Sequence, residues 1–425
     1  MMRRRWTIAF LLSAGVLVNY FDRVNLTVSH DALISEFGIT DVTFGFLLGA
    51  YNWTYAACQL PSGVLLDRFG VRSVGIVSIL LWSIASFAAA LTRGVGGFFG
   101  ARFLLGVGEA PTFPANAKAI GYWFPPEKRS FATALFDCSA KFSSAVGVPL
   151  IGLLLLRVGW RLSFAATGFV SLLYFLLFFV LYRDPQSDPS LVVAGADIAQ
   201  SEVSDSVAQS IASKPRITIR YLLRQKNVIG LAVGFGSYNY VFYLLLTWLP
   251  VYLSRALHID LAHSFAYTGV PWIFATAADL IVGGWLVDAL IHRGWNANRV
   301  RRVVLIGGTT MGLGILGAAH AHTPGQALFW ISLSISGLSA AAPVGWSIPA
   351  LIAPGDSVGK VGGIMNLSNQ ISGIVAPIVT GYLVSGRQSF AAAFGVATAY
   401  LAVGILAYIF LLGRIRKVDL PPQSA

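Results

Sequence analysis

Charged residues are scarce in this chain of 425 residues: Asp, Glu, Lys and Arg together make up 11% of it, whereas soluble domains carry about 25%. Cysteine is scarcer still, with only Cys58 and Cys138. Both lie in apolar segments, so the sequence excludes a disulfide framework and predicts two small buried side chains that bind no metal. Apolar residues fill the chain instead, at 56% of the total with a mean hydropathy of +0.70. This composition excludes a soluble domain.

Motifs for covalent chemistry are also missing. No nucleophile–base pair, metal-binding cluster or phosphate-binding loop can be found in the sequence, so an enzyme, a cofactor and a metal site are all unexpected. None of the six histidines falls deep in an apolar run. Any proton carried through the apolar region would therefore travel on carboxylates. A sensor that binds a ligand without turnover would usually carry a soluble output domain, and none is visible.

Twelve apolar runs have the length needed to cross a bilayer. The first follows three arginines but is too long for the apolar core of a signal peptide, so we expect it to be retained. One long polar interruption divides the runs into six plus six. The sequence therefore predicts an all-α membrane protein with twelve transmembrane helices. The expected spans are 7–30, 43–66, 73–92, 96–122, 130–156, 161–182, 228–254, 262–287, 303–319, 326–352, 360–384 and 389–412.

The two sets of six runs are related. The first spans of the two sets begin 221 residues apart, and the same offset separates Gly63 from Gly284 and Asp67 from Asp288. Two parallel six-helix halves with a substrate bound between them are typical of secondary transporters. We therefore expect two pseudo-symmetric six-helix bundles. Their expected bounds are 1–182 for the N-terminal bundle, 183–227 for a cytoplasmic linker and 228–425 for the C-terminal bundle with a short cytoplasmic tail.

The net charge of +12 would suit a nucleic-acid partner, but the distribution of the basic residues favours a membrane. With the N-terminus placed inside, 21 of the 30 Lys and Arg residues fall on the cytoplasmic side, five fall outside and four lie within spans. This distribution follows the positive-inside rule, and the basic excess would meet anionic lipid headgroups. We therefore expect a multi-pass protein of the inner (plasma) membrane, with both termini cytoplasmic and no nucleic-acid partner.

The fourth span carries two charges, Arg102 and Glu109. Because they are seven residues apart, they share one helix face, about 10 Å apart along the axis. A charge in hydrocarbon is costly and usually faces the interior of a bundle or a watery cavity. Three glycines nearby permit close helix packing, and Pro111 and Pro114 interrupt the helix just after the glutamate. The pattern predicts a helix built around a buried charged site.

Two other spans contain neighbouring charges. In the first span, Asp22 and Arg23 lie about 100° apart around the helix. Either they form an internal ion pair that fixes packing, or Arg23 reaches an anionic ligand while Asp22 takes up protons. In the fifth span, Asp137 and Lys141 are four residues apart on one face; either they neutralise each other, or Lys141 adds a second cation to the cavity. For Asp279 in the eighth span we expect a structural or gating role.

The turn between the second and third spans, residues 63–72, reads Gly-Val-Leu-Leu-Asp-Arg-Phe-Gly-Val-Arg. Its glycines allow close helix packing and a tight reversal, and its charges can pair across the cytoplasmic face or cap a helix end. A degraded copy in the second half ends in Asp288. We interpret both as conformational latches and not as substrate sites. The expected gating residues are Gly63, Asp67, Arg68, Gly70, Arg72 and Asp288.

Several further segments carry a family pattern. They are Tyr20-Phe-Asp22-Arg23-Val-Asn-Leu, Gln59-Leu-Pro-Ser-Gly63, the stretch from Arg102 to Pro114, Trp123-Phe-Pro and Leu246-Thr-Trp-Leu-Pro250. The turn at 63–72 resembles the signature loop of the major facilitator superfamily, G-x-x-x-D-R-x-G-x-R. The other segments are similar to its anion:cation symporter family, which includes proton-coupled sugar-acid transporters and organic-anion carriers. The resemblance covers nearly the whole chain and weakens in the central loop.

This resemblance implies a secondary transporter that imports a small organic anion, such as a hexonate, hexuronate or aldarate, with protons by alternating access. The alternative is an organic-anion exchanger without net proton coupling. We expect a monomer in the lipid bilayer, without a cofactor or metal. By resemblance, Asp22 and Glu109 carry the proton. The residues expected to bind substrate are Arg23, Tyr55, Arg102, Lys141, Trp346 and Asn366, of which Lys141 departs from the family pattern.

Overall fold

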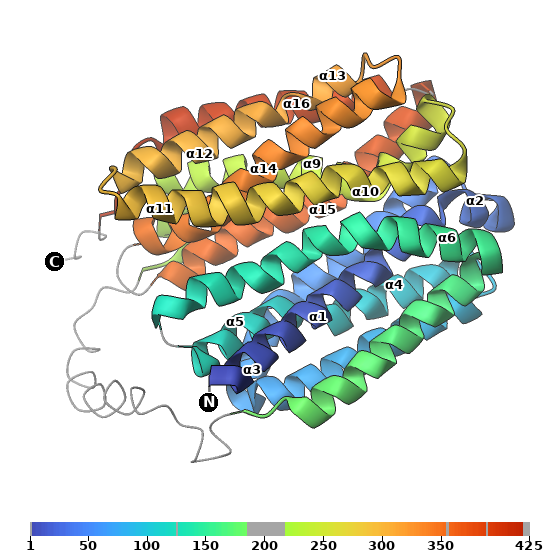
Figure 1. The fold of residues 1–425 in the computed structure, drawn as a ribbon, viewed down its shortest axis with the longest axis horizontal. Coiled ribbons are helices and arrows are strands. Elements are labelled where there is room, and N and C mark those ends of the chain that lie inside the picture. The colour runs from blue at the N-terminus through green and yellow to red at the C-terminus, as the bar shows by residue number, and fades with distance from the viewer. Residues whose placement is uncertain (1, 125, 185–216, 354–356, 388–389, 420–425) are drawn as a thin grey trace.

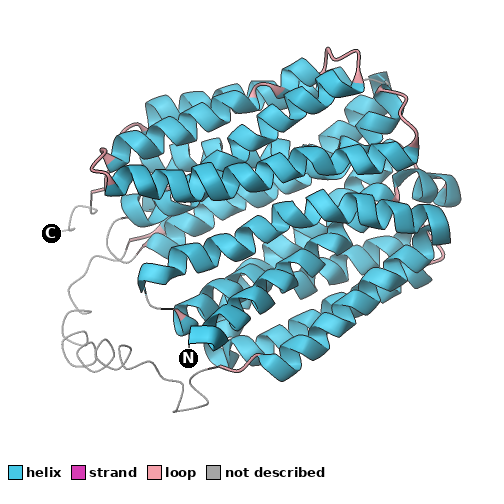
Figure 2. Ribbon diagram, viewed as in Figure 1, coloured by secondary structure: helices cyan, strands magenta, loops and turns pink. Residues whose placement is uncertain are grey.

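The structure is a computed structural model that describes residues 2–124, 126–184, 217–353, 357–387 and 390–419. Helices make up nearly all of this described part, and no strand occurs in it (Figure 2). Most of the expected linker, 183–227, lies outside the described residues, and the short helix α8 (Ile219–Leu222) belongs to its described end. The all-α fold predicted from the sequence is confirmed.

Six spans make up the first half of the chain. The helix bounds are α1 (Met2–Val28), α2 (His30–Phe37), α3 (Asp41–Leu91), α4 (Val95–Glu109), α5 (Thr112–Trp123) and α6 (Pro126–Leu181). The long helices α3 and α6 each contain two spans, because the chain reverses at Gly70 (φ 78°) and at Gly159 (φ 80°). Glycine adopts this left-handed backbone without the steric cost that other residues would incur. Helices α4 and α5 form one span, broken at Pro111, which cannot continue the hydrogen-bond ladder of α4.

The second half repeats this plan with more interruptions. The bounds are α9 (Lys226–Ala256), α10 (Leu261–Ala278), η4 (Asp279–Leu286), α11 (Val287–His292), α12 (Ala297–Gly312), α13 (Ile315–Ala318), α14 (Pro324–Ile352), α15 (Val358–Arg387), α16 (Phe390–Leu406) and η5 (Ala407–Leu412). The segments η4 and η5 are π-helical. Three spans are composite: α10 with η4 and α11, α12 with α13, and α16 with η5.

The twelve predicted transmembrane helices are confirmed. Nine described helices are individually long and apolar enough to cross a membrane, and the broken or merged spans in α3, α4–α5 and α6 account for the rest. Several bounds differ from the prediction by a few residues, and two differences are larger. The ninth span begins at Ala297 and not at 303, because the Asn296 side chain caps its first turn and the basic residues that follow are helical. Helix α2, which follows the first span, was not expected.

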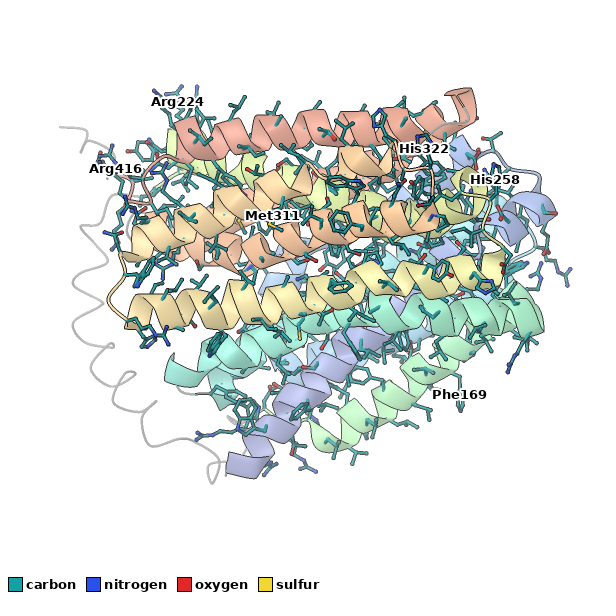
Figure 3. All side chains as sticks on the ribbon, turned by 45° about the horizontal axis from the view of Figure 1, so that its top comes forward. Phe169, Arg224, His258, Met311, His322 and Arg416 are labelled. Atoms are coloured by element: carbon teal, nitrogen blue, oxygen red, sulfur yellow. The ribbon has the colours of Figure 1, made fainter. Side chains whose placement is uncertain are left out.

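The spans form two bundles that lie side by side along their length (Figure 1). Helices α1 to α6 make up one bundle, and α9 to η5 make up the other. The first and last described residues, at the start of α1 and after η5, lie at the same end of the molecule, which we call the terminal end (Figure 1). Arg224 and Arg416 also lie there, whereas His258 and His322 lie at the opposite, far end (Figure 3).

The two bundles contact each other closely in their far halves. Helix α3 packs against α15, where a side chain at Gly45 would come within 2.7 Å of the Pro377 carbonyl oxygen. Helix α6 packs against α10, where Phe265 fills the place that a side chain at Gly152 would occupy. Small residues allow such close helix approach in a membrane, where apolar surface alone drives little association. The bundles thus approach each other closely where α3 meets α15 and where α6 meets α10.

Candidate functional site

Arg23 and Glu109 form a buried ion pair between α1 and α4. The guanidinium Nε and Nη2 of Arg23 lie 3.2 and 3.1 Å from Oε2 of Glu109. Only 7% of the Arg23 side chain and none of the Glu109 side chain is exposed. Nη2 of Arg23 also donates to the Tyr51 hydroxyl. The spacing of the fourth span suggested Arg102 as the neighbour of Glu109, but the first helix supplies its ion-pair partner.

Tyrosines enclose the Arg23 guanidinium. Its central carbon lies 4.4 Å from the ring centre of Tyr20, 4.5 Å from that of Tyr51 and 5.6 Å from that of Tyr55, distances at which aromatic faces stabilise a cation. The predicted residue Tyr55 is therefore beside Arg23. Tyr20 and Tyr51 were missed, although Tyr20 is three residues before Arg23 and Tyr51 is four before Tyr55, both helical spacings that share a face.

The second bundle also reaches this place. Tyr243 of α9 is buried and lies within electrostatic reach of Arg23. Its ring packs where a side chain at Gly373 of α15 would lie. On the facing helix α3, Asn52 donates to the Gly373 carbonyl oxygen at 3.0 Å. The Arg23–Glu109 pair thus lies beside the interface between the bundles.

Asp22 faces a different direction from Arg23. Its two carboxylate oxygens accept hydrogen bonds from Ser86 of α3 at 2.7 Å and from Ser171 of α6 at 3.2 Å. The internal pair between Asp22 and Arg23 that the sequence allowed does not form. Arg102 donates from Nη1 to the backbone oxygen of Asp22 at 3.3 Å, and its buried Nε has no hydrogen-bond partner among the described residues.

The sequence of the fourth span explains how Glu109 is held. Helix α4 ends at Glu109, and α5 begins at Thr112, so the break falls where the prolines predicted it. A side chain at Gly108 would come within 2.8 Å of the Trp82 nitrogen of α3. The glycine therefore brings α4 against α3 at the level of the carboxylate, and Glu109 is fully buried there.

Lys141 is at the centre of a second charged group. Its Nζ lies 3.0 Å from Asp137 Oδ2 on the same helix, α6, and also forms an ion pair with Asp279 at the start of η4. The predicted contact between Asp137 and Lys141 is present. The contact with Asp279 was missed, because a single sequence does not reveal which face of the eighth span meets the fifth.

The remaining predicted substrate residues come from the second bundle. Trp346 of α14 is 44% exposed, and its ring contacts that of Phe235 at 5.2 Å between centres. Asn366 of α15 is half-buried. One turn further along α15, the side-chain oxygens of Asn369 and Gln370 are buried without a hydrogen-bond partner in the described part of the chain. Neither Trp346 nor Asn366 contacts Arg23 directly in the interactions we find among the described residues.

The predicted latch at 63–72 contacts the end of the sixth span. The backbone nitrogen of Arg72 donates to Asp184 Oδ2 at 3.0 Å, and its guanidinium donates to the Phe179 carbonyl at 3.3 Å. Among the described residues nothing lies close beside Gly63, so this glycine makes no close helix contact with them. Arg68 and Asp288 are exposed, and the side chain of Asp67 lies outside the described residues.

A further charged cluster joins the bundles at the far end. Arg255 of α9 donates to both carboxylate oxygens of Asp41 at 3.0 Å and to Asp31 at 3.1 Å. The buried His30 ring lies between the same carboxylates, 2.7 Å from Asp31 and 2.9 Å from Asp41. The hydrogen bond with His30 lowers the pKa of Asp31 in α2 below its ordinary value, and Arg255 adds to this effect. We call His30, Asp31, Asp41 and Arg255 the far-end lock.

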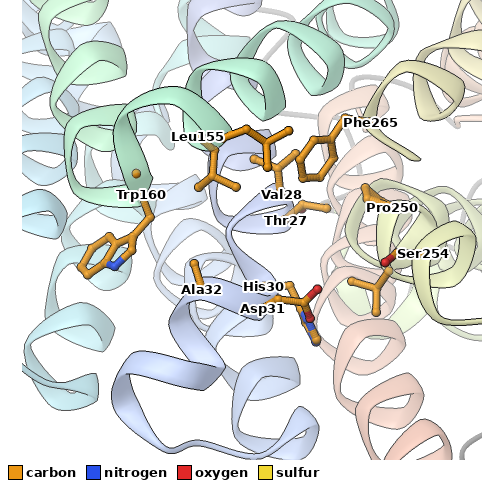
Figure 4. Close-up of a pocket in the computed structure, with 13 residues that line it drawn as sticks. Thr27, Val28, His30, Asp31, Ala32, Leu155, Trp160, Pro250, Ser254 and Phe265 are labelled. Carbon is orange, nitrogen blue, oxygen red and sulfur yellow. The ribbon is translucent and has the colours of Figure 1, made fainter. Parts of the chain in front are cut away.

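A cavity of about 370 Å³ adjoins the far-end lock (Figure 4). It lies between the bundles, and its walls are mostly apolar, with Leu155 and Phe265 beside Thr27 and Asp31. A second, much smaller cavity lies beside Asp22 and Arg102. Its volume of about 10 Å³ is close to the volume that one water molecule needs.

Two six-helix bundles that meet beside buried ion pairs define a multi-pass membrane transporter. The family model of the Major Facilitator Superfamily matches residues 12–296, and the chain belongs to this superfamily. It is therefore a transporter and not an enzyme, as the sequence predicted.

Relatives and solved structures agree with this assignment. An uncharacterized transporter of Bacillus subtilis, YybO, is 37% identical over 98% of this chain and 96% of its own length. A probable galactarate/D-glucarate transporter of the same species is 29% identical, covering 99% of this chain and 94% of the relative. A probable sulfoacetate transporter of Cupriavidus necator is 30% identical, covering 100% and 97%. The crystal structure of a D-xylose-proton symporter has the same fold, with a TM-score of 0.73, 16% identity and coverage of 97% and 98%.

Proposed function

We propose that this protein is a secondary active transporter that imports a small organic anion of the sugar-acid class, together with protons, by alternating access. The observation that carries the proposal is the buried Arg23–Glu109 ion pair, enclosed by tyrosines beside the bundle interface. The similarity to a probable galactarate/D-glucarate transporter supports an aldarate or a related sugar acid as substrate.

The ion pair offers a direct way to couple a proton to an anion. When Glu109 takes up a proton, it loses its charge, and Arg23 becomes available to donate charge-assisted hydrogen bonds to a substrate carboxylate. In the other direction, an anion on Arg23 favours the protonated form of Glu109. Proton and anion therefore bind cooperatively, and by linkage each strengthens the binding of the other by the same factor.

Polar groups from both bundles would complete the substrate site. In the first bundle, Tyr51 and Tyr55 present hydroxyl groups that can pair with those of a sugar acid. In the second bundle, we assign the same role to Asn366 and to the side-chain oxygen of Gln370 on α15, which has no hydrogen-bond partner among the described residues. Trp346 would close one wall with its exposed ring.

Asp22 and Arg102 have supporting roles in this proposal. The neutral hydroxyl donors around Asp22 satisfy its oxygens whether or not it carries a charge, so it is a second position for a proton. Arg102, whose contact with Asp22 is to the backbone, balances the negative charge that remains. The adjoining cavity has room for about one water molecule, through which a proton could leave Asp22.

We assign the terminal end to the cytoplasm of a cell with an inner membrane, because the basic residues gather there. In this orientation the far-end lock closes the outer side. The bundles, 1–182 and 228–425, would rock about the substrate site, tethered by the linker 183–227. The turn at 63–72 and Asp288 would act as latches on the inner side. The protein would work as a monomer.

Uptake into proteoliposomes tests the proposal. Galactarate, D-glucarate and sulfoacetate serve as labelled probes, with an imposed pH gradient, acidic outside. Accumulation of one sugar acid above its external concentration, together with proton entry, is the expected result. The matched control is Glu36→Gln, a carboxylate of α2 at the far end, which should behave as the wild type.

The rival function, anion exchange, predicts another result. An exchanger moves labelled anion only against a preloaded anion and gives no accumulation in empty vesicles under a pH gradient. If the protein transports sulfoacetate in preference to both sugar acids, the proposed transport mechanism stands, but the substrate class is a sulfonated acid and not a sugar acid.

A further inference from the structure

Lys141 lies between two carboxylates that belong to different bundles. Asp137 is one turn before it on α6, whereas Asp279 begins η4 in the second bundle. The two carboxylates differ in exposure: 23% of the Asp137 side chain is accessible, against 2% for Asp279. One cation and two anions leave this group with one excess negative charge when all three are ionised.

The backbone at Asp279 is also unusual. Asp279 is the first residue of the π-helical segment η4, at about the middle of the eighth span. A π-helical turn weakens the regular hydrogen-bond ladder and is found frequently at functional sites. Gly283 in the same segment packs against the Ala340 carbonyl and Pro343 of α14. Asp279 and Gly283 are four residues apart and share one face of η4, so this face meets both Lys141 of α6 and the backbone of α14.

Among the described residues, few groups that can hold a charge or a proton face Asp279. Those within electrostatic reach are Lys141, Asp137 and Cys138 from α6 and Tyr238 from α9. Helix α14, which also packs against η4, carries no charged residue. Lys141 is thus the cation that compensates Asp279 among the described residues.

Alternating access would change the charge balance between Lys141 and Asp279, because it moves the two bundles relative to each other. If α6 and η4 separate, Asp137 stays with Lys141, because both lie on one helix. Asp279 would then lack its compensating cation within the membrane, which is costly for an ionised carboxylate. A proton removes this cost. Protonation of Asp279 and separation of the two bundles at this level therefore favour each other.

We propose that Asp279 is a further proton-binding carboxylate of the transport cycle, which takes up a proton as its ion pair with Lys141 breaks and releases it as the pair re-forms. The proton comes from the water on the side to which the site is open and leaves to the other side. Lys141 with Asp137 remains a neutral pair throughout. This inference rests on the proposed function and adds a coupling site across the bundles to the Arg23–Glu109 pair within one bundle.

Infrared difference spectra between acidic and neutral pH test the proton directly on the purified full chain in lipid, without substrate. Compared with the wild type, Asp279→Asn should show a weaker band of protonated carboxyl groups, and the difference should correspond to one group. The band should be unchanged in the matched variant Asp137→Asn, which leaves the Lys141–Asp279 pair intact. In Asp279→Glu, the band of one protonated carboxyl group should move from the frequency of an aspartic acid to that of a glutamic acid. This shift serves as the test if Asp279→Asn does not fold. Spectra that are the same in all variants would overturn the proposal.

Proton counting in proteoliposomes gives the second test. With D-glucarate as probe, Asp279→Asn should carry one proton fewer per substrate than the wild type, and Asp137→Asn should carry the same number. If the number of protons per substrate is unchanged in Asp279→Asn but reduced in Glu109→Gln, Asp279 is not a proton-coupling residue, and the proposed function stands. If the wild type carries no protons, the proposed symport fails, and the infrared spectra alone decide whether Asp279 is protonated.

Discussion

The two carboxylate oxygens of Glu109 have different surroundings. Oε2 accepts both contacts from Arg23, whereas Oε1 is buried and has no hydrogen-bond partner among the described residues. A proton can therefore be added to Oε1 without displacing a hydrogen bond. The charge of the carboxylate is lost, but its contact with Arg23 can persist until an anion replaces it. This asymmetry suits a group that must be protonated before the substrate binds.

Glu109→Gln imitates the protonated state, so it should retain anion binding and lose proton coupling. We expect the dissociation constant for D-glucarate to change by less than about tenfold between pH 5 and pH 8, a difference of about 1.4 kcal/mol. Uptake against a gradient should be abolished, while exchange continues. Binding titrations over this pH range and uptake assays measure both effects. A Glu109→Gln variant that still concentrates substrate under a pH gradient would move the proton role to Asp22.

Replacing Arg23 should affect binding more than replacing Arg102. A charge-assisted hydrogen bond contributes about 1.5–3 kcal/mol, so Arg23→Gln should raise the dissociation constant roughly 10- to 100-fold. Arg23→Gln also leaves Glu109 unpaired, and the double variant with Glu109→Gln separates this loss of stability from the loss of binding. Arg102→Gln should weaken binding less, because Arg102 donates to a backbone oxygen. Equal affinity in wild type and Arg23→Gln, measured by titration, would make Arg23 a structural residue.

Residue spacing predicted part of this site. The spacing within one helix correctly placed Asp137 beside Lys141. The pairing of Arg23 with Glu109 and of Lys141 with Asp279 could not be predicted, because each depends on how two helices are rotated against each other. The depth of the charged residues indicated a functional site, but the choice of partner is a property of the packed bundle.

At the scale of helices, spans were predicted well because length and apolarity determine them. The proline after Glu109 correctly located the break between α4 and α5. The π-helical turn at Asp279 was not predicted, since residues 279–286 look like any apolar helix. Helix α2 was missed because it follows the first span after a single residue and, at eight residues, is too short to be recognised as a span.

The contact between α6 and η4 leads to a stability prediction. Lys141→Gln leaves two carboxylates without a cation and should cost about 3–5 kcal/mol. Asp137→Asn keeps the buried Lys141–Asp279 pair and should be mild. Adding Asp279→Asn to Lys141→Gln should restore more stability than adding Asp137→Asn, because the remaining carboxylate is then the partly exposed Asp137. Thermal unfolding in detergent ranks the variants, and the opposite order of rescue would contradict the inter-bundle pair.

At the scale of the whole molecule, the charged groups occupy different levels of one interface. The far-end lock joins the bundles at one end, the Lys141–Asp279 pair joins them at mid-depth, and the Arg23–Glu109 pair lies beside the interface within the first bundle. Opening of the far end must break the lock. Opening that reaches mid-depth must also break the Lys141–Asp279 pair. Opening the far side therefore requires these ionic contacts to break together with the close helix packing around them.

The far-end lock gives the last prediction. Arg255→Gln removes the contacts to Asp31 and Asp41 and should shift the bundles toward a state that is open at the far end. Spin labels at the exposed positions Ser35 and His322, one in each bundle, report the distance between the bundles at this end. In Arg255→Gln we expect a larger fraction of molecules with a long distance between the two labels, as in the state open at the far end. Arg161→Gln, which removes a contact within the first bundle, serves as the control.

The pH dependence of this lock has a definite sign. Because hydrogen bonding with His30 and the charge of Arg255 lower the pKa of Asp31, its stabilising effect is fully present above the ordinary pKa of 3.8 and is lost only as the pH falls through the lower folded value. The contact of Arg255 with Asp31 should therefore persist between pH 5 and pH 8, the range over which Glu109 is proposed to control binding. Asp31→Asn should then open the far end to the same extent at both pH values, as measured by the same two labels. A wild-type lock that opens at pH 5, with Asp31→Asn insensitive to pH, would instead make Asp31 a proton switch.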